Sequence, residues 1–223
     1  SNGFSSNRIG WLWKRHAGFD VVAYEGDEVS TNDRVIRHSL GKIPEMIWVK
    51  NRTINYSWDV YHKGMNGGTN PWNYGMHLNE TGAESADSSV WNNTAPTSLG
   101  FTVGSSHTVN RDGSNFIAML FASVDGISKV GSFVGSDSDQ TITTGFQPRF
   151  VIIKQTSGSF ASWYVLDTTR GWGSGNDNWL LLNENQAQSS NNVGAPTSTG
   201  FTVTGNFGGI NDAGFSCIYY AHA

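Results

Sequence analysis

The sequence predicts an all-β protein built from tandem antiparallel β-sandwich repeats. Only 14% of its residues are charged, and 13% are aromatic, whereas an ordinary soluble domain has roughly 25% charged residues. Short apolar segments alternate along the chain with clusters of Gly, Asn, Ser and Asp, which are typical of turns. The second half of the chain also repeats the first. These observations favour many short strands over helices or disorder.

Two halves of the chain match each other in order. Residues 40–50, LGKIPEMIWVK, align with residues 144–154, TGFQPRFVIIK, and keep a Gly, a Pro, an apolar run and a closing Lys. The tetrapeptide GFTV occurs at 100–103 and again at 200–203, so the period is near 100 residues. Shorter matches pair Ser57-Trp58 with Ser162-Trp163, Leu78-Asn79-Glu80 with Leu182-Asn183-Glu184, and Ala95-Pro96-Thr97-Ser98 with Ala195-Pro196-Thr197-Ser198. We infer a duplicated unit, because chance similarity does not explain so many ordered matches.

Each full repeat contains seven segments with the pattern of a strand. Residues 46–49 and 150–153 are continuously apolar, so we expect central strands that are covered on both faces. Phe101 and Val103 alternate with Thr, which indicates a strand with one face in solvent. The predicted strands span 21–24, 34–38, 45–51, 57–62, 75–79, 101–104 and 115–122, and then 129–134, 140–143, 149–155, 162–167, 179–183, 201–204 and 215–221.

The N-terminal segment has the pattern of the last strand of a preceding unit. Residues 9–13 and Gly18 occupy the places of residues 117–121 and Gly126. We therefore divide the chain into a terminal strand of a preceding or incomplete repeat (1–18), a first sandwich repeat (19–126) and a second (127–223). The sequence leaves open whether the chain is a fragment of a longer repeat protein. It also leaves open whether the repeats form separate sandwiches or share one larger pair of sheets.

Charge and hydropathy exclude two classes of partner. The net charge is −4, and the 14 Lys and Arg residues are spread singly along the chain apart from Lys14-Arg15. No basic stripe could therefore neutralise a run of phosphates, and we expect no nucleic-acid binding. No apolar run approaches the roughly 18 to 20 residues that cross a bilayer, so we expect no membrane insertion.

The sequence contains no catalytic or metal-binding motif. Its acidic residues are scattered through turn-like segments, where an Asx-turn is the expected role and a catalytic carboxylate pair is not. The six His and the single Cys217 do not have zinc-site spacing, and Cys217 lies in an apolar stretch that predicts a buried thiol. We therefore expect no enzyme, no metal and no cofactor. The acidic residues on which this rests include Asp137, Asp139, Asp177 and Asp212.

Aromatic residues in polar loop segments are the candidate ligand-binding residues. A sugar offers a C–H face to an aromatic ring and hydroxyls to Asn, Asp and Ser, and loops commonly carry recognition. The alternative is that these rings pack in the loops and close the ends of the sandwiches. Trp58 and Trp163 hold equivalent places in both repeats and are predicted core residues. The binding candidates are Trp72, Tyr74 and Trp91 in the first repeat and Trp172 and Trp179 in the second.

A lysine ends the apolar strand in each repeat. Lys50 and Lys154 hold this place, and Asp59 and Asp167 belong to the strands that follow. We expect a cross-strand ion pair in each repeat, with a structural role.

Six segments of the chain also carry a resemblance to a known family. They are residues 11–15, 19–24, 40–52, 57–64, 91–97 and 127–131. Together they resemble the uncharacterised repeat domains of tail-fibre-like virion proteins of marine bacteriophages, over residues 11–223. The resemblance implies a jelly-roll or lectin-like (concanavalin-like) sandwich without a catalytic motif, in an exterior appendage of the virion.

The function that this resemblance implies is adhesion to a host-surface glycan or receptor. The implied partners are that glycan or receptor, other virion proteins and further copies of the chain in a homo-oligomer such as a trimer. The alternative is a purely structural virion repeat whose aromatic residues, Trp72 and Trp91 among them, pack at subunit interfaces. A depolymerase is disfavoured, because the sequence shows no carboxylate pair.

Overall fold

Strands dominate the structure, and the predicted all-β fold is confirmed. The computed structural model describes residues 10–15, 18–28, 34–158, 161–173, 175–205 and 207–223. In these ranges the longest helical elements have four residues. Accordingly, no helix of the described chain is long and apolar enough to cross a membrane. All pairings between the named strands are antiparallel.

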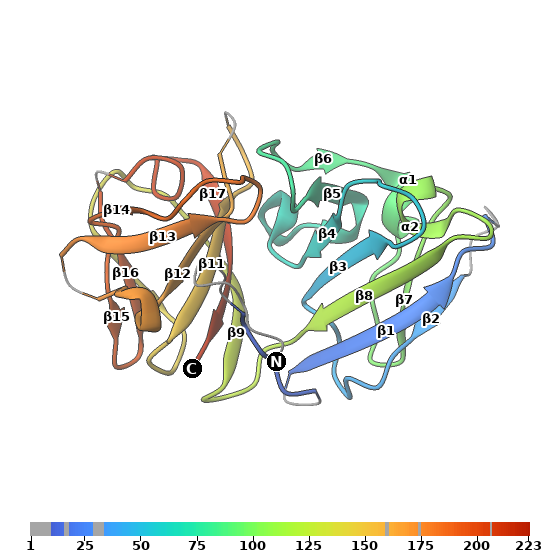
Figure 1. Cartoon of the computed structure of the whole chain (residues 1–223), viewed down its shortest axis with the longest axis horizontal. Helices are drawn as coiled ribbons and strands as arrows, with labels where there is room; N and C mark the ends of the chain where they lie inside the picture. Colours follow the sequence, from blue (N-terminus) through green and yellow to red (C-terminus); the bar gives the residue numbers. More distant parts are fainter. Residues whose placement is uncertain (1–9, 16–17, 29–33, 159–160, 174, 206) are drawn as a thin grey trace, which may run out of the picture.

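The first half of the chain forms a six-stranded sheet and a two-stranded sheet (Figure 1). The large sheet has the order β1-β8-β3-β4-β5-β6, and the small sheet pairs β2 with β7. The elements are β1 (Phe19–Glu25), β2 (Val35–Arg37), β3 (Met46–Asn51), β4 (Asp59–His62), η1 (Met65–Gly68), η2 (Pro71–Asn73), β5 (Tyr74–His77), β6 (Ser85–Ala86), α1 (Ser88–Trp91), β7 (Gly100–Thr102), α2 (His107–Asn110) and β8 (Asn115–Phe121).

The second half forms a six-stranded and a three-stranded sheet. Its elements are β9 (Ser128–Val134), β10 (Gln140–Thr143), β11 (Phe150–Gln155), β12 (Tyr164–Asp167), η3 (Thr168–Arg170), β13 (Asp177–Leu181), β14 (Ser189–Asn191), β15 (Pro196–Thr197), β16 (Gly200–Val203) and β17 (Ser216–His222). The large sheet has the order β9-β17-β11-β12-β13-β14, and the small sheet β10-β16-β15. The two large sheets therefore share one strand order, and all fourteen strands predicted within the two repeats are present with their ends within two residues.

Three hydrophobic cores separate four layers of sheet. One core lies between the large and small sheets of the first half and another between those of the second. The third, which we call the central core, joins Trp48 and Phe121 of the first half to Ile152 and Tyr220 of the second. Each half is thus a sandwich, and in addition the two large sheets pack face to face.

This arrangement explains why the central strands are apolar without interruption. Along β11, Phe150 and Ile152 contribute to the central core, whereas Val151 and Ile153 contribute to the core inside the second half. Successive side chains of a strand point to opposite faces, so a strand between two cores needs apolar residues at every position. The expectation that residues 46–49 and 150–153 are covered on both faces is confirmed.

Polar contacts also join the two halves. Trp163 is buried in the central core, as predicted, and its Nε1 donates to the carbonyl of His77 at 2.9 Å. The Nε2 of His62 lies 3.2 Å from the carbonyl oxygen of Tyr219. The backbone N–H of Glu84 donates to the Thr156 carbonyl at 2.9 Å. Trp58, the counterpart of Trp163, is only partly buried against the same core.

The expected lysine–aspartate pairs were wrong. Asp59 lies opposite Val49 in the sheet, so its side chain and that of Lys50 point to opposite faces. Asp167 lies opposite Phe150, at the far end of the strand from Lys154. The actual partners are Tyr56 O for Lys50, His77 for Asp59, Arg170 for Asp167, and the carbonyls of Gln155 and Thr81 for Lys154.

The scattered aspartates anchor loops, but through contacts other than the expected Asx-turns, most of them with residues distant in sequence. Asp137 accepts a hydrogen bond from Ala213 N at 2.9 Å, and Asp139 accepts one from Gly205 N at 2.9 Å. Asp177 and Asp212 likewise accept from backbone N–H groups. The predicted burial of Cys217 is confirmed, and burial raises the pKa of its thiol to about 12.

The strand expected near the N-terminus is not formed in residues 10–13, while Ile9 lies outside the described residues. Gly18 has φ +77°, and a Cβ there would lie 2.7 Å from the Ala122 carbonyl oxygen, so the turn into β1 requires glycine. Trp11 and Trp13 instead pack against the central core.

Candidate functional site

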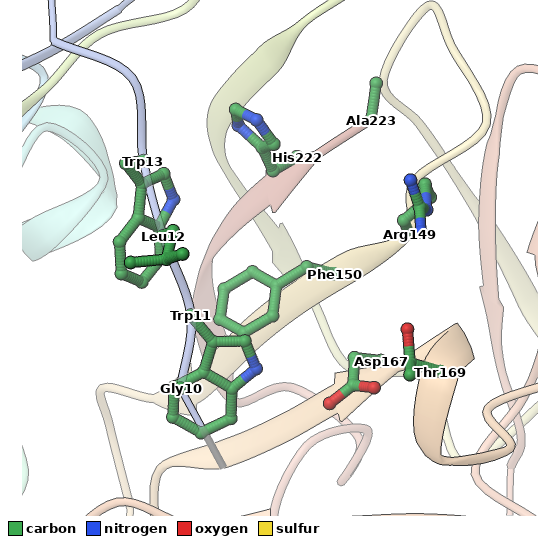
Figure 2. Close-up of a pocket in the computed structure, with 10 residues that line it drawn as sticks. All are labelled: Gly10, Trp11, Leu12, Trp13, Arg149, Phe150, Asp167, Thr169, His222 and Ala223. Atoms are coloured by element: carbon green, nitrogen blue, oxygen red, sulfur yellow. The ribbon is translucent and has the colours of Figure 1, made fainter. Parts of the chain in front are cut away.

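A pocket of about 400 Å³ lies where the segment before β1 meets the second half of the chain (Figure 2). Ligand pockets commonly have volumes of roughly 300 to 1,000 Å³. The segment contributes one wall, and the ends of β11, β12 and β17 with the turn η3 contribute the other. The lining residues are Gly10, Trp11, Leu12, Trp13, Arg149, Phe150, Asp167, Thr169, His222 and Ala223.

Strand register places three of these side chains in one row. Phe150 at the start of β11 lies opposite Asp167 of β12 on one side and opposite His222 of β17 on the other. Residues opposite one another in an antiparallel sheet point to the same face. This face is the one that carries the central core, since Phe150 belongs to that core.

Two indole rings and one phenyl ring form the apolar part of the pocket. The ring centroids of Trp11 and Phe150 are 5.5 Å apart, and those of Trp13 and Phe150 are 5.7 Å apart at an interplanar angle of 81°. Trp13 also meets the edge of Phe121, so its ring is held by both halves of the chain. Figure 2 shows the Trp11 ring beside Phe150, with the carboxylate of Asp167 across the pocket from Trp13.

The polar part of the pocket combines a fixed acceptor with a free donor. Asp167 accepts from the backbone N–H of Arg170 at 2.9 Å and from its Nε at 2.5 Å, which fixes the carboxylate. The exposed guanidinium of Arg149 makes no hydrogen bond or ion pair within the described chain. Nδ1 of His222 lies 3.0 Å from the hydroxyl of Tyr220. Burial lowers the pKa of His222, so its ring is neutral at pH 7.

This combination suits a polyhydroxylated ligand. The C–H face of a sugar packs on an aromatic ring, while its hydroxyls both donate and accept hydrogen bonds. Asp167, opposite Phe150 on the neighbouring strand, supplies acceptor oxygens, and Arg149, directly before Phe150, supplies donors. Within the described residues, no group of three or more His, Cys, Asp or Glu side chains could hold a metal ion.

The five aromatic candidates from the sequence lie elsewhere. Trp91 and Trp172 are each 2% exposed and belong to the cores inside the two sandwiches, as the loop-packing alternative has it. Trp72, Tyr74 and Trp179 are partly buried against the cores. The crevice between Trp72 and Trp91 has a volume of about 0 Å³, so it has no room for a ligand. None of the five lines the 400 Å³ pocket.

Sequence analysis missed the residues of this pocket for a physical reason. Trp11 and Trp13 are two residues apart, a spacing that a strand and an extended segment share, and we interpreted them as a strand. Asp167 and His222 become neighbours of Phe150 only through the register of three strands. The one feature of the sequence that could have indicated the pocket is the pair Trp11 and Trp13, which is directly followed by Lys14 and Arg15 and lies outside the two full repeats.

Comparison with known proteins identifies a family over nearly the whole chain. Residues 5–223 match a family described as a domain of unknown function, DUF7483. No curated protein and no solved structure gave a match. The chain therefore belongs to the DUF7483 domain family.

Proposed function

We propose that this chain is a glycan-binding module of a phage exterior appendage and that the pocket at Trp11, Phe150 and Asp167 holds the host-surface glycan. The observation that carries the proposal is the aromatic pair beside a fixed carboxylate and an unpaired guanidinium in one pocket. The resemblance of the sequence to tail-fibre-like repeat domains supplies the setting. In this setting, other virion proteins and further copies of the chain are the expected neighbours.

The pocket residues differ in how much the surrounding sheet depends on them, and this difference guides the choice of variants. Trp11 lies in a segment outside the sheets. Arg149 has an exposed side chain, and among the described residues only its backbone makes hydrogen bonds. Both can therefore be truncated without opening a sheet. Asp167 is bonded to Arg170 and is buried, so its loss would disturb the end of β12 as well as the pocket.

Trp11→Ala is expected to weaken glycan binding about tenfold or more, because an aromatic platform contributes roughly 1.5 to 3 kcal/mol. Arg149→Ala is expected to weaken binding several-fold through the loss of hydrogen bonds. The measurement is a glycan array followed by calorimetric titration of the best glycan, with the melting temperature of each variant recorded. Trp179→Phe is the matched control, since Trp179 is a partly buried tryptophan outside the pocket.

Saturable binding that both pocket variants weaken and the control keeps would support the proposal. If the folded wild-type chain binds no glycan on the array, or if Trp179→Phe weakens binding as much as Trp11→Ala, the pocket has been assigned wrongly.

A structural role in the virion is the second candidate, and one observation favours it. Ile43 and Leu99 are 55% and 68% exposed, so two large aliphatic side chains are available for contact with a second copy. Ile43 and Ser98, the neighbour of Leu99, line an open groove of about 580 Å³ at the same end of the first half. If copies of the chain pack through this groove, light scattering will show an oligomer that Leu99→Ser converts to a monomer. A monomeric wild-type chain would argue against this role.

A further inference from the structure

A second, smaller pocket lies at the end of the first sandwich. Its volume is about 200 Å³, and it is bounded by β4, β5, β6, the turn that follows β5 and the start of α1. Four of its lining residues are ionisable, namely Asp59, His77, Glu80 and Asp87. The other lining residues are Gly75, Met76, Gly82, Ala83, Ser85 and Val90, so no lysine or arginine faces this space.

Asp59 is the unusual member of this group. It is 2% exposed, and its Oδ2 is buried without a hydrogen-bond partner in the described part of the chain. Its Oδ1 lies 3.6 Å from Nδ1 of His77, which is too long for a hydrogen bond. The Nδ1 of His77 is likewise buried and has no hydrogen-bond partner among the described residues. Asp59 is therefore a buried carboxylate with one oxygen that lacks a hydrogen-bond partner, although Thr108 donates a side-chain hydrogen bond to the group. A buried polar atom without a partner costs folding free energy, and a bound donor would remove that cost.

The neighbouring carboxylates are only partly engaged. One oxygen of Glu80 accepts from the Ser57 hydroxyl at 2.5 Å. One oxygen of Asp87 accepts from the backbone N–H of Ser89 at 2.8 Å and from its hydroxyl at 2.6 Å, which caps α1. The second oxygen of each carboxylate takes no part in these bonds. Three carboxylates and His77 therefore surround one small space, which no lysine or arginine of the described residues lines.

The second half of the chain provides an internal comparison. Asp59 pairs with His77 across β4 and β5, and the corresponding pair across β12 and β13 is Tyr164 with Leu181. Gly75 corresponds to Trp179, whose ring contacts that of Tyr164 at 5.3 Å between centroids. Aromatic and aliphatic side chains thus take the place that the first half leaves open. The acidic pocket is not required by the fold, because the same strand order is built without it.

We propose that this pocket binds a small primary ammonium ligand, with Asp59 as its principal acceptor and Glu80 and Asp87 as the outer acceptors. An ammonium group donates three hydrogen bonds, and its positive charge compensates the negative charge of the carboxylates. A volume of 200 Å³ corresponds to roughly seven water molecules, which suits a short alkyl amine and excludes a larger ligand. A quaternary ammonium is excluded, because it has no N–H to donate and no aromatic residue lines this space.

The charge state of the free protein agrees with this assignment. Burial raises the pKa of Asp59 to about 6, and the carboxylates of Asp87 and Glu80 act in the same direction, whereas Thr108 and His77 oppose it. At pH 8 the group is ionised, and the Thr108 hydrogen bond and His77 compensate its buried charge only in part.

The test is calorimetric titration at pH 8 and low ionic strength with 1,4-diaminobutane, and with 1,4-butanediol as the neutral ligand of the same length. We expect saturable binding of one diamine per chain and no measurable binding of the diol. Asp59→Asn should weaken diamine binding at least tenfold. Glu184→Gln is the matched control, because Glu184 is the counterpart of Glu80 in the second half, and it should bind as the wild type does.

Gly75→Trp provides a second variant that keeps every charge. A Cβ at Gly75 has no neighbour closer than 3.9 Å, and an indole there would occupy the pocket as Trp179 does in the second half. We expect it to abolish diamine binding. Binding that survives both Asp59→Asn and Gly75→Trp, equal binding of the diol, or no saturable binding to the folded wild-type chain would overturn the proposal. Because no glycan is involved, these outcomes are independent of the test of the Trp11 pocket.

Discussion

Trp163→Ala is expected to lower the free energy of unfolding by roughly 4 to 5 kcal/mol. The indole is 1% exposed in the central core, and its Nε1 donates to the His77 carbonyl of the other half. Truncation therefore leaves a cavity between the two large sheets and removes the hydrogen bond to that carbonyl. For a chain of this size, the melting temperature should fall by about 8 to 20 °C. Thermal and denaturant unfolding, followed by circular dichroism, measure both quantities.

The internal repeat supplies a matched control for this variant. Trp58 holds the equivalent sequence position in the first half but is only partly buried against the central core. We expect Trp58→Ala to lower the free energy of unfolding by less than half as much as Trp163→Ala does. If both variants lose the same stability, or if Trp163→Ala leaves the melting temperature unchanged, the two large sheets do not share the core described here.

Acidification is expected to weaken the contact between the halves through His62. This side chain is fully buried, and burial lowers its pKa to about 4 from the usual value near 6.5. Gly64 N donates to Nδ1 at 2.9 Å, so the ring is neutral and Nε2 carries the proton that faces Tyr219 O. Because the unfolded chain binds the proton more readily, this contribution is complete above pH 6.5 and is lost as the pH falls to 4. The loss amounts to about 3 kcal/mol.

Asp59 opposes this trend, so variants are needed to separate the two. Its pKa is raised to about 6, and the folded chain therefore gains stability from this group as the pH falls from 6 to 4. Asp59 is present in both the wild type and His62→Gln. Its contribution therefore cancels when the unfolding free energies of the two proteins are subtracted. That difference should shrink by about 3 kcal/mol between pH 7 and pH 4. A difference that does not change with pH would show that His62 titrates normally.

The strands could be predicted from the sequence because their cause is local. An apolar run such as 150–153, bounded by turn residues, identifies a strand without knowledge of its neighbours. The match between the two halves then predicted a repeated order of strands, and both large sheets have that order. The short strands β6, β14 and β15 were missed, because segments of two or three residues carry no periodic pattern.

The packing of the two halves and the pockets could not be predicted in this way. The central core forms on the face of β11 that carries Phe150 and Ile152. Because β11 is apolar at every position, its sequence does not show which face packs against the other half of the chain. Aromatic residues in loop-like segments, such as Trp91, proved to be core residues because the loops fold over the sandwich ends. Trp11 joins Asp167 only through long-range contacts between segments more than 150 residues apart in sequence.

The measurement that tests the glycan-binding proposal most directly is titration of the chain, labelled with ¹⁵N at its nine tryptophans, with the best glycan from the array. Each indole N–H gives its own signal, and single Trp→Phe variants assign them. We predict that the signals of Trp11 and Trp13 shift in a saturable manner, while those of the buried Trp91 and Trp172 stay in place. Shifts confined to Trp72 or Trp179, with Trp11 unmoved, would contradict the proposed site.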